Sequence, residues 1–129
     1  MCGTVEFKLA KPQQNASACH CTQCRKWSGH YWASINGPID GFKITKGEDK
    51  VSWYQSSDYA RRGFCGSCGS SLFWHGFGLS SFAKLISVSA GTLENTKNIT
   101  LGRHIFCEHK GSYYELNDGV PTYTTYPGA

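Results

Sequence analysis

Five cysteines lie in two short motifs whose spacing is suited to metal binding. Three of them fall within six residues, in the run Cys19-His-Cys21-Thr-Gln-Cys24, and two more form Cys65-Gly-Ser-Cys68. Two thiolates separated by two residues can both reach one zinc ion at about 2.3 Å if the chain between them turns tightly. A glycine inside the second motif and another directly after it allow the backbone angles of such a turn. This motif therefore predicts a zinc knuckle.

Disulfide and redox interpretations fit these cysteines less well. The chain has seven cysteines, an odd number that a complete disulfide framework would not use. Cys21-Thr-Gln-Cys24 is a C-x-x-C pair, but the redox version of that motif belongs to a βαβ context that the sequence does not indicate. No apolar stretch has the length of a signal peptide or of a membrane helix, so no membrane partner is expected. The expected location is the cytoplasm, where thiols stay reduced.

The spacing leaves two metal arrangements open. In the first, one ion takes Cys21, Cys24, Cys65 and Cys68 as a tetrathiolate site. In the second, two ions bind: the later motif takes Cys2 as its third ligand, and the three thiols of the earlier motif hold a second ion. That second ion would keep one open coordination position, as catalytic zinc does.

The elements that must position these motifs are predicted to be β-strands. Fifteen glycines and eighteen aromatic residues (four Trp, seven Tyr and seven Phe) favour pleated sheets joined by tight turns. No long segment shows a helical stripe, although residues 92–97 could form one helical turn. We expect an all-β fold of packed antiparallel sheets with zinc-binding loops, in one domain spanning residues 1–129, with an extended tail from residue 118. Strands are predicted at 5–9, 30–35, 42–45, 51–55, 71–74, 85–90, 104–108 and 112–116.

Several other residues carry weaker predictions. His20 lies between two presumed ligands and should point away from the ion that they share. Strand alternation places Cys107 beside Ile105, so we expect it in the core as a small hydrophobe. Arg25 follows the third thiol and could bind a carboxylate of an anionic substrate. The net charge of +4 is scattered, with Arg61-Arg62 among the densest points, and does not form the basic stripe of a nucleic-acid binder.

Four runs together resemble the glutathione-dependent formaldehyde-activating enzyme family. They are CGTVEFKL, CHCTQCRKWSG, RRGFCGSCGSSLFW and RHIFCEHKGSYYELNDGVPTY, and they occur in the expected order along nearly the whole chain. The resemblance implies a tent-like all-β fold with two zinc positions. By this likeness Cys19, Cys21 and Cys24 are ligands of an open, catalytic zinc.

The resemblance also implies that Cys2, Cys65 and Cys68 provide three of the four ligands of a structural zinc. The family's fourth ligand lies two residues before Cys2, a position that precedes Met1 in this sequence. Three outcomes are therefore open for that site: a water completes it, a nearby side chain or the α-amino group of Met1 completes it, or it stays empty. We expect it to bind metal more weakly than a tetrathiolate site.

The function implied by the resemblance is carbon–sulfur lyase chemistry of the S-(hydroxymethyl)glutathione synthase type. The thiol of glutathione, or of a similar carrier, would add to a small aldehyde such as formaldehyde. An open zinc could lower the pKa of the incoming thiol or polarise the aldehyde oxygen. The alternative is a zinc-stabilised β-module in which both ions are structural and the chain binds a partner without catalysis. An exchangeable ligand in the open position would favour the enzyme.

Overall fold

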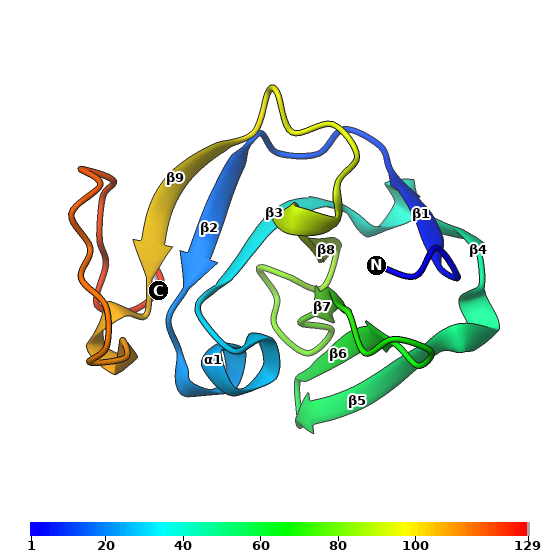
Figure 1. Ribbon diagram of the computed structural model, residues 1–129, viewed down its shortest axis with the longest axis horizontal. Coiled ribbons are helices and arrows are strands. Elements are labelled where there is room, and N and C mark those ends of the chain that lie inside the picture. The colour runs from blue at the N-terminus through cyan, green and yellow to red at the C-terminus, as the bar shows by residue number, and fades with distance from the viewer. Residues whose placement is uncertain (129) are drawn as a thin grey trace.

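Two β-sheets and one short helix organise the chain in the computed structural model, which describes residues 1–128 (Figure 1). The smaller sheet pairs β1 (Glu6–Leu9) with β4 (Phe42–Lys46). The larger sheet has the order β5-β6-β7-β8-β3-β2-β9. Its strands are β2 (Asn15–Cys19), β3 (Trp32–Pro38), β5 (Val51–Ser57), β6 (Ala60–Cys65), β7 (Ser71–His75), β8 (Leu85–Ser89) and β9 (Thr100–Ile105). The helix is α1 (Thr22–Ser28), and short 3₁₀ segments cover Ile39–Gly41, Glu48–Lys50, Ala90–Thr92 and Cys107–His109.

The predicted all-β class is confirmed, with one difference in strand direction. Every neighbouring pair of strands is antiparallel except β2 and β9, which run parallel, so the larger sheet is mixed. The parallel pairing brings residues more than 80 positions apart in the sequence side by side, as in the pair Ala18 and His104. This edge of the sheet lies directly beside the first cysteine motif.

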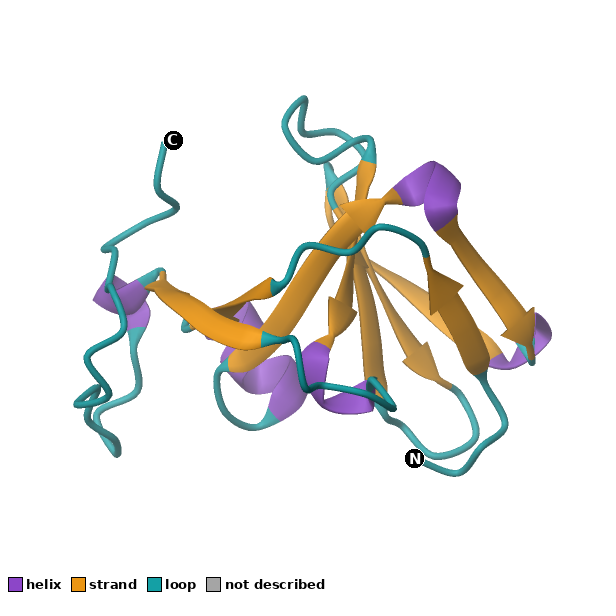
Figure 2. Ribbon diagram, turned by 90° about the horizontal axis from the view of Figure 1, so that it is seen from above, coloured by secondary structure: helices purple, strands orange, loops and turns teal. Residues whose placement is uncertain are grey.

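The core lies between the two sheets (Figure 2). Alternation along the strands of the larger sheet places Ile35, Phe73 and Val88 on one face, where they are almost fully buried. The smaller sheet covers this face through Phe7 and Phe42, whose rings lie 5.0 Å and 4.9 Å from the ring of Phe73 in edge-on contacts. Such aromatic pairs add about 0.5–1.5 kcal/mol each beyond the burial of their area.

The opposite face of the larger sheet is polar and carries the helix. The register aligns Ser17, Ser34 and Ser89 in one row across three strands. The helix α1 reaches the other half of the sheet, where the Trp27 carbonyl accepts a hydrogen bond from Ser71 Oγ in β7 (3.5 Å). The helix ends at Gly29, whose positive φ of 87° closes the last turn by a hydrogen bond to the Arg25 carbonyl.

Strand predictions near the C-terminus were wrong in two places. The strand expected at 104–108 ends at Ile105, because Phe106 adopts a positive φ of 56° and breaks the extended chain. The segment 112–116 forms no strand. Instead the tail runs beside β9, where the His104 N–H donates to the Pro121 carbonyl and the Tyr123 N–H donates to the His104 carbonyl.

Two strands and the helix were missed, and two other elements have different bounds. The strands β2 and β6 and the helix α1 were not predicted. The strand expected at 30–35 begins at Trp32 and continues to Pro38, because residues 36–38 pair with β8. The helical turn expected at 92–97 is a 3₁₀ segment at Ala90–Thr92.

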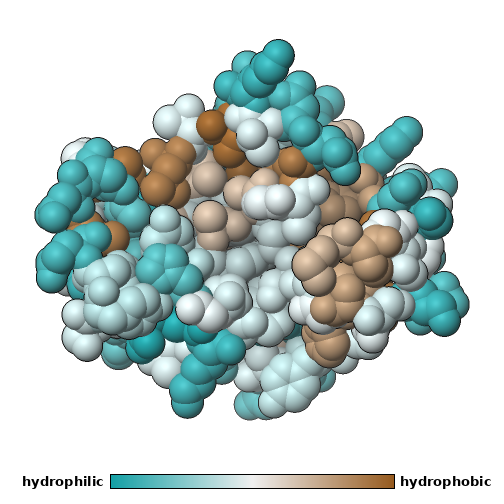
Figure 3. Space-filling model, viewed as in Figure 1, coloured by the Kyte–Doolittle hydropathy of each residue, from teal (hydrophilic) through white to brown (hydrophobic). Residues whose placement is uncertain are grey.

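The visible surface is mixed in character. Figure 3 shows hydrophilic residues mainly around the rim and hydrophobic residues in smaller groups between them. Across residues 1–128, no helix has the length and apolar character needed to cross a membrane.

Candidate metal centres

The three thiols of the first motif converge at the junction of β2 and α1. Cys19 is the last residue of β2, and Cys21 is the N-cap of α1. The Cys21 sulfur accepts a hydrogen bond from the Cys24 N–H (3.4 Å), as N-cap side chains do. Cys24 lies in the first turn of the helix and is buried. The three sulfur atoms all lie within 4.8 Å of one another.

The donor set fits a thiophilic divalent cation. In a tetrahedron with zinc–sulfur bonds of about 2.3 Å, neighbouring sulfur atoms are about 3.8 Å apart, which the spacing of these thiols allows. Hydrogen bonds from Cys19 and Cys24 lower the pKa of Cys21 to about 2. The hydrogen bond to Cys21 raises the pKa of Cys19. For Cys24, a hydrogen bond with Cys19 that lowers the pKa is outweighed by the bond to Cys21 and by burial, and its pKa rises to about 11.

Three thiolates this close would repel one another, because like charges disfavour each other. Holding all three in the ionised form requires a cation among the sulfur atoms. A zinc ion meets that requirement.

A buried arginine lies against this cluster. Arg62 in β6 is only 5% exposed, and its Nη1 lies 3.6 Å from Cys24 Sγ. Its Nη2 donates to Gln23 Oε1 (3.2 Å), and the guanidinium lies 5.0 Å from the ring centre of Trp27. No carboxylate among residues 1–128 forms an ion pair with Arg62.

Arg62 could balance the charge of a metal-loaded thiolate site. Three thiolates with one Zn²⁺ would carry a net charge of −1, and the guanidinium would bring the local sum to zero. Because an uncompensated buried charge is costly, an arginine without a carboxylate at this position favours an anionic cluster beside it. The sequence analysis noted Arg61-Arg62 only as a dense point of charge. The strand β6, which aims Arg62 at the helix, was not predicted.

The second cluster joins the N-terminus to the core. The sulfur atoms of Cys2, Cys65 and Cys68 lie within 4.8 Å of one another, and Cys2 Sγ is 3.8 Å from Cys65 Sγ. Cys65 belongs to the buried core, Cys68 packs against it, and Cys2 is exposed. The turn has the expected form: Gly69 has a φ of 80°, and its N–H donates to the Cys65 carbonyl (2.7 Å).

The pKa of the Cys2 thiol is lowered by its local hydrogen bonds. Its hydrogen bond with the Thr4 hydroxyl (3.1 Å), followed by other bonds to Thr4 and Cys68, lowers its pKa to about 6. A thiolate is therefore available at neutral pH for a metal. The six thiols thus form two groups of three, and the structure does not bring both C-x-x-C pairs together in one group of four.

Other predicted residues lie differently from expectation. Arg25 Nε donates to the carbonyls of His20 (3.3 Å) and His109 (3.0 Å), so it ties the first motif to the C-terminal segment. Its predicted contact with a substrate stays a prediction. Cys107 is half-buried in a 3₁₀ segment and not in the core, because the turn at Phe106 ends the alternation on which that expectation relied. His20 is fully buried.

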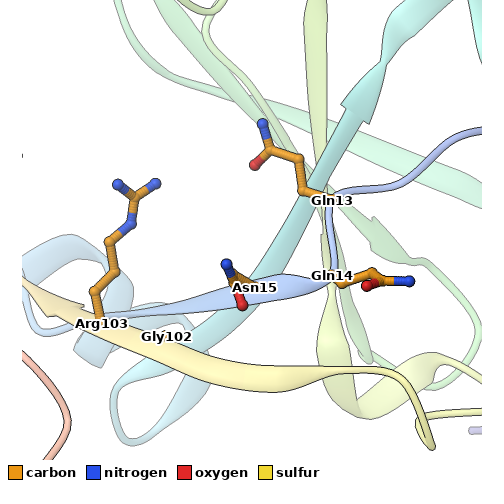
Figure 4. Close-up of a pocket in the computed structure, with 5 residues that line it drawn as sticks. All are labelled: Gln13, Gln14, Asn15, Gly102 and Arg103. Atoms are coloured by element: carbon orange, nitrogen blue, oxygen red, sulfur yellow. The ribbon is translucent and has the colours of Figure 1, made fainter.

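A polar pocket of about 470 Å³ lies over the paired strands β2 and β9, near the start of β2 (Figure 4). It is lined by Gln13, Gln14, Asn15, Gly102 and Arg103. Arg103 pairs with Ser17 in the sheet, and its Nε donates to Ser17 Oγ (2.8 Å) while its Nη2 donates to the Tyr126 hydroxyl (3.0 Å). Because side chains alternate along β2, Asn15 and Ser17 lie on the same face as Cys19.

The fold and the two cysteine clusters define an all-β class of protein with two triads able to hold metal ions. Residues 1–109 match the model of the family described as glutathione-dependent formaldehyde-activating enzyme, and the chain belongs to this family. The family resemblance seen in the sequence is therefore confirmed.

Two further similarities agree with this assignment. The chain is 24% identical over 129 residues to a protein of Schizosaccharomyces pombe named uncharacterized lyase C29B12.13, covering 96% of this chain and 87% of that protein. It also resembles a crystal structure of a Rhodobacter sphaeroides protein, with a TM-score of 0.60 and 24% identity over 73% of this chain and 84% of the other. This structural likeness supports the fold.

Proposed function

We propose that the chain is a zinc-dependent lyase-type enzyme that adds a thiol, such as glutathione, to a small aldehyde, such as formaldehyde. The family match and the relative named as a lyase support the general class. The observation that carries the finer proposal is the convergence of Cys19, Cys21 and Cys24 with a buried cation, Arg62, beside them. Three donors leave a tetrahedral ion one position for a substrate.

The reaction forms one carbon–sulfur bond and breaks one carbonyl π bond. The sulfur of the carrier attacks the aldehyde carbon, the π electron pair moves to the oxygen, and the proton released by the thiol ends on that oxygen. A bound zinc ion would supply thiol activation, because coordination lowers the pKa of a thiol. In this proposal Cys19, Cys21 and Cys24 hold the ion, and Arg62 keeps the cluster close to neutral.

The pocket at Arg103 is a suitable place for the polar part of the carrier. Ser17, which Arg103 contacts, precedes Cys19 by two residues on the same face, a separation of about 7 Å along the strand. A tripeptide thiol can span this separation. The guanidinium and the amides of Gln13 and Asn15 offer the donors that a carboxylate requires. We propose that Arg103, in addition to Arg25, binds a carboxylate of the carrier.

The cluster of Cys2, Cys65 and Cys68 is proposed to hold a second, structural zinc ion. An ion held by exposed Cys2 and buried Cys65 would join the N-terminal segment to the core. We propose a reducing compartment such as the cytoplasm for this activity, because cysteine ligands must stay reduced to bind a metal ion.

The test is an exchange experiment at equilibrium. The rate at which ¹³C-formaldehyde enters and leaves its thiol adduct is measured by NMR with the zinc-loaded protein, with either glutathione or 2-mercaptoethanol as the thiol. We expect faster exchange with the wild type than without protein, and loss of this effect in Cys21→Ala. Arg103→Met should reduce the acceleration of exchange with glutathione about tenfold. The acceleration with 2-mercaptoethanol, which has no carboxylate, should be unchanged. No acceleration by a protein carrying zinc at both clusters would refute the proposal.

A further inference from the structure

A chain of four side chains runs behind the first cysteine motif and is not used by the proposed reaction. The Tyr114 hydroxyl lies 2.6 Å from His20 Nδ1, and His20 Nε2 lies 2.9 Å from His104 Nδ1. His104 Nε2 lies 2.8 Å from Asp118 Oδ2. Both histidines are buried, with exposed fractions of 0% and 1%.

An ionised Asp118 and a neutral His104 ring set the direction of the hydrogen bonds in this chain. The carboxylate only accepts, so His104 Nε2 carries the hydrogen, and in that neutral tautomer Nδ1 accepts. His20 therefore donates from Nε2 and accepts at Nδ1, and the donor to that atom is the Tyr114 hydroxyl.

The backbone of His20 is held as firmly as its ring. Its N–H donates to the Ile105 carbonyl (3.0 Å), and its carbonyl accepts from Arg25 Nε (3.3 Å). His20 is the residue between Cys19 and Cys21, so a displacement of its backbone moves two of the three sulfur atoms. The hydrogen bonds of its ring and of its backbone therefore hold the loop that carries these ligands.

We propose that His20, His104, Tyr114 and Asp118 form a positioning unit that sets the geometry of the metal site at Cys19, Cys21 and Cys24. None of the four is proposed to touch the metal ion or the substrate. The family model matches residues 1–109. Two of the four residues, Tyr114 and Asp118, lie in the C-terminal segment outside that match. The inference rests on the proposed metal site, because it concerns the orientation of that site's ligands.

Substitutions at His104 separate positioning from simple packing. His104→Leu fills the space but leaves buried His20 Nε2–H without an acceptor. In His104→Gln, the amide oxygen can accept from His20 and the amide nitrogen can donate to Asp118, because the two polar atoms of an amide are about as far apart as the two ring nitrogens. Tyr114→Phe removes the donor at the other end and is a milder change, because this residue is only partly buried.

The experiment uses the full chain loaded with Co²⁺, whose absorption bands report the geometry of thiolate ligands, together with competition by a chelator. We expect His104→Leu to weaken metal binding at the first cluster about 10–100-fold, as partners of ligand residues typically do, and to shift the bands. His104→Gln should restore both properties to within about threefold. Binding at Cys2, Cys65 and Cys68 should be unchanged in both variants.

Each outcome bears on the proposal. Wild-type affinity and bands in His104→Leu would overturn it while leaving the proposed function intact, as would equal weakening at both clusters. Absence of Co²⁺ binding by the first cluster of the wild type would overturn both the inference and the proposed function. If His104→Leu does not fold, Tyr114→Phe decides: shifted bands at the first cluster alone support the positioning unit, and unchanged bands contradict it.

Discussion

The side chain with the clearest electrostatic meaning is Arg62. A buried guanidinium usually lies beside a carboxylate, and among residues 1–128 the one candidate counter-charge within hydrogen-bond reach of Arg62 is the Cys24 sulfur. The interaction is much stronger when that sulfur is ionised. Arg62 and a metal ion therefore favour the same thiolate state of the cluster and should strengthen each other's effect.

Replacing Arg62 by Met should weaken zinc binding at the first cluster by roughly 10–100-fold. The guanidinium is lost, so the charge of −1 on the loaded site is no longer balanced. Arg62→Lys should recover part of the affinity, since it restores the charge without the planar fork. Zinc affinity is measured by competition with a coloured chelator.

The neighbouring residue provides a matched control. Arg61 lies 4.1 Å from the ring centre of Trp53 and contacts neither cluster, so Arg61→Met should keep the zinc affinity of the wild type. Equal affinities in Arg61→Met and Arg62→Met would show that Arg62 does not balance the cluster's charge.

At the scale of elements, the sequence predicted what local patterns determine. The turn after Cys65 follows from C-x-x-C with glycines, and strands such as β7 follow from alternating apolar residues. The helix α1 was not predicted because seven residues are too few to show a 3.6-residue stripe. Its stability depends on its Cys21 cap, its Gly29 end and its contacts with the sheet. The strand β2 was not predicted because its sequence, NASAC, lacks the β-branched and aromatic residues that are enriched in strands.

The partners of His20 could not be predicted because they depend on pairing between distant elements. His104 lies beside the first motif because β2 pairs in parallel with β9. Asp118 lies in the tail that follows and contacts His104. Local patterns determine neither. The sequence predicted only that the His20 side chain points away from the ion. In the structure this side chain is buried and contacts Tyr114 of the C-terminal segment.

The N-terminal segment depends on a close contact at the start of a 3₁₀ segment. Gly47 has a φ of 71°, and a Cβ built there would overlap the Thr4 carbonyl oxygen. Gly47→Ala should therefore displace Cys2 and cost about 1–3 kcal/mol of unfolding free energy. We expect the metal at Cys2, Cys65 and Cys68 to bind more weakly, with the first cluster unaffected.

Gly91→Ala is the comparison for this prediction, because no atom lies within 4 Å of a Cβ built at Gly91. Thermal melting and metal content of the two variants decide it. If Gly47→Ala melts at the same temperature and retains metal as well as Gly91→Ala, the arm that carries Cys2 is not held in this way.

Across the whole molecule, the two clusters have different structural tasks. Cys65 is part of the main core, so an ion bound there stabilises the contact between the N-terminus and the larger sheet. The first cluster lies at the junction of one strand and the helix, on the opposite, polar face. A ligand lost from each should therefore have a different consequence.

We expect Cys68→Ser to lower the free energy of unfolding by several kcal/mol, because binding energy at a structural zinc is folding energy. Cys21→Ser should leave most of the stability intact while removing one zinc ion and any exchange activity. Denaturant unfolding and zinc analysis are the measurements, with Cys107→Ser as the control, since Cys107 belongs to neither cluster. Equal unfolding of both cluster variants would instead favour one shared site.

The proposed ion at Cys19, Cys21 and Cys24 keeps one coordination position open for the carrier's thiol. The most direct measurement is a titration of the Co²⁺-loaded protein with glutathione, followed by the sulfur-to-cobalt charge-transfer band. A fourth thiolate should strengthen this band until one glutathione is bound per protein, and S-methylglutathione, which has no free thiol, should leave it unchanged. The same titration of Cys21→Ser should give no such increase. A band that glutathione does not alter in the wild type would mean that the metal site is closed. That result would contradict the proposed open coordination position.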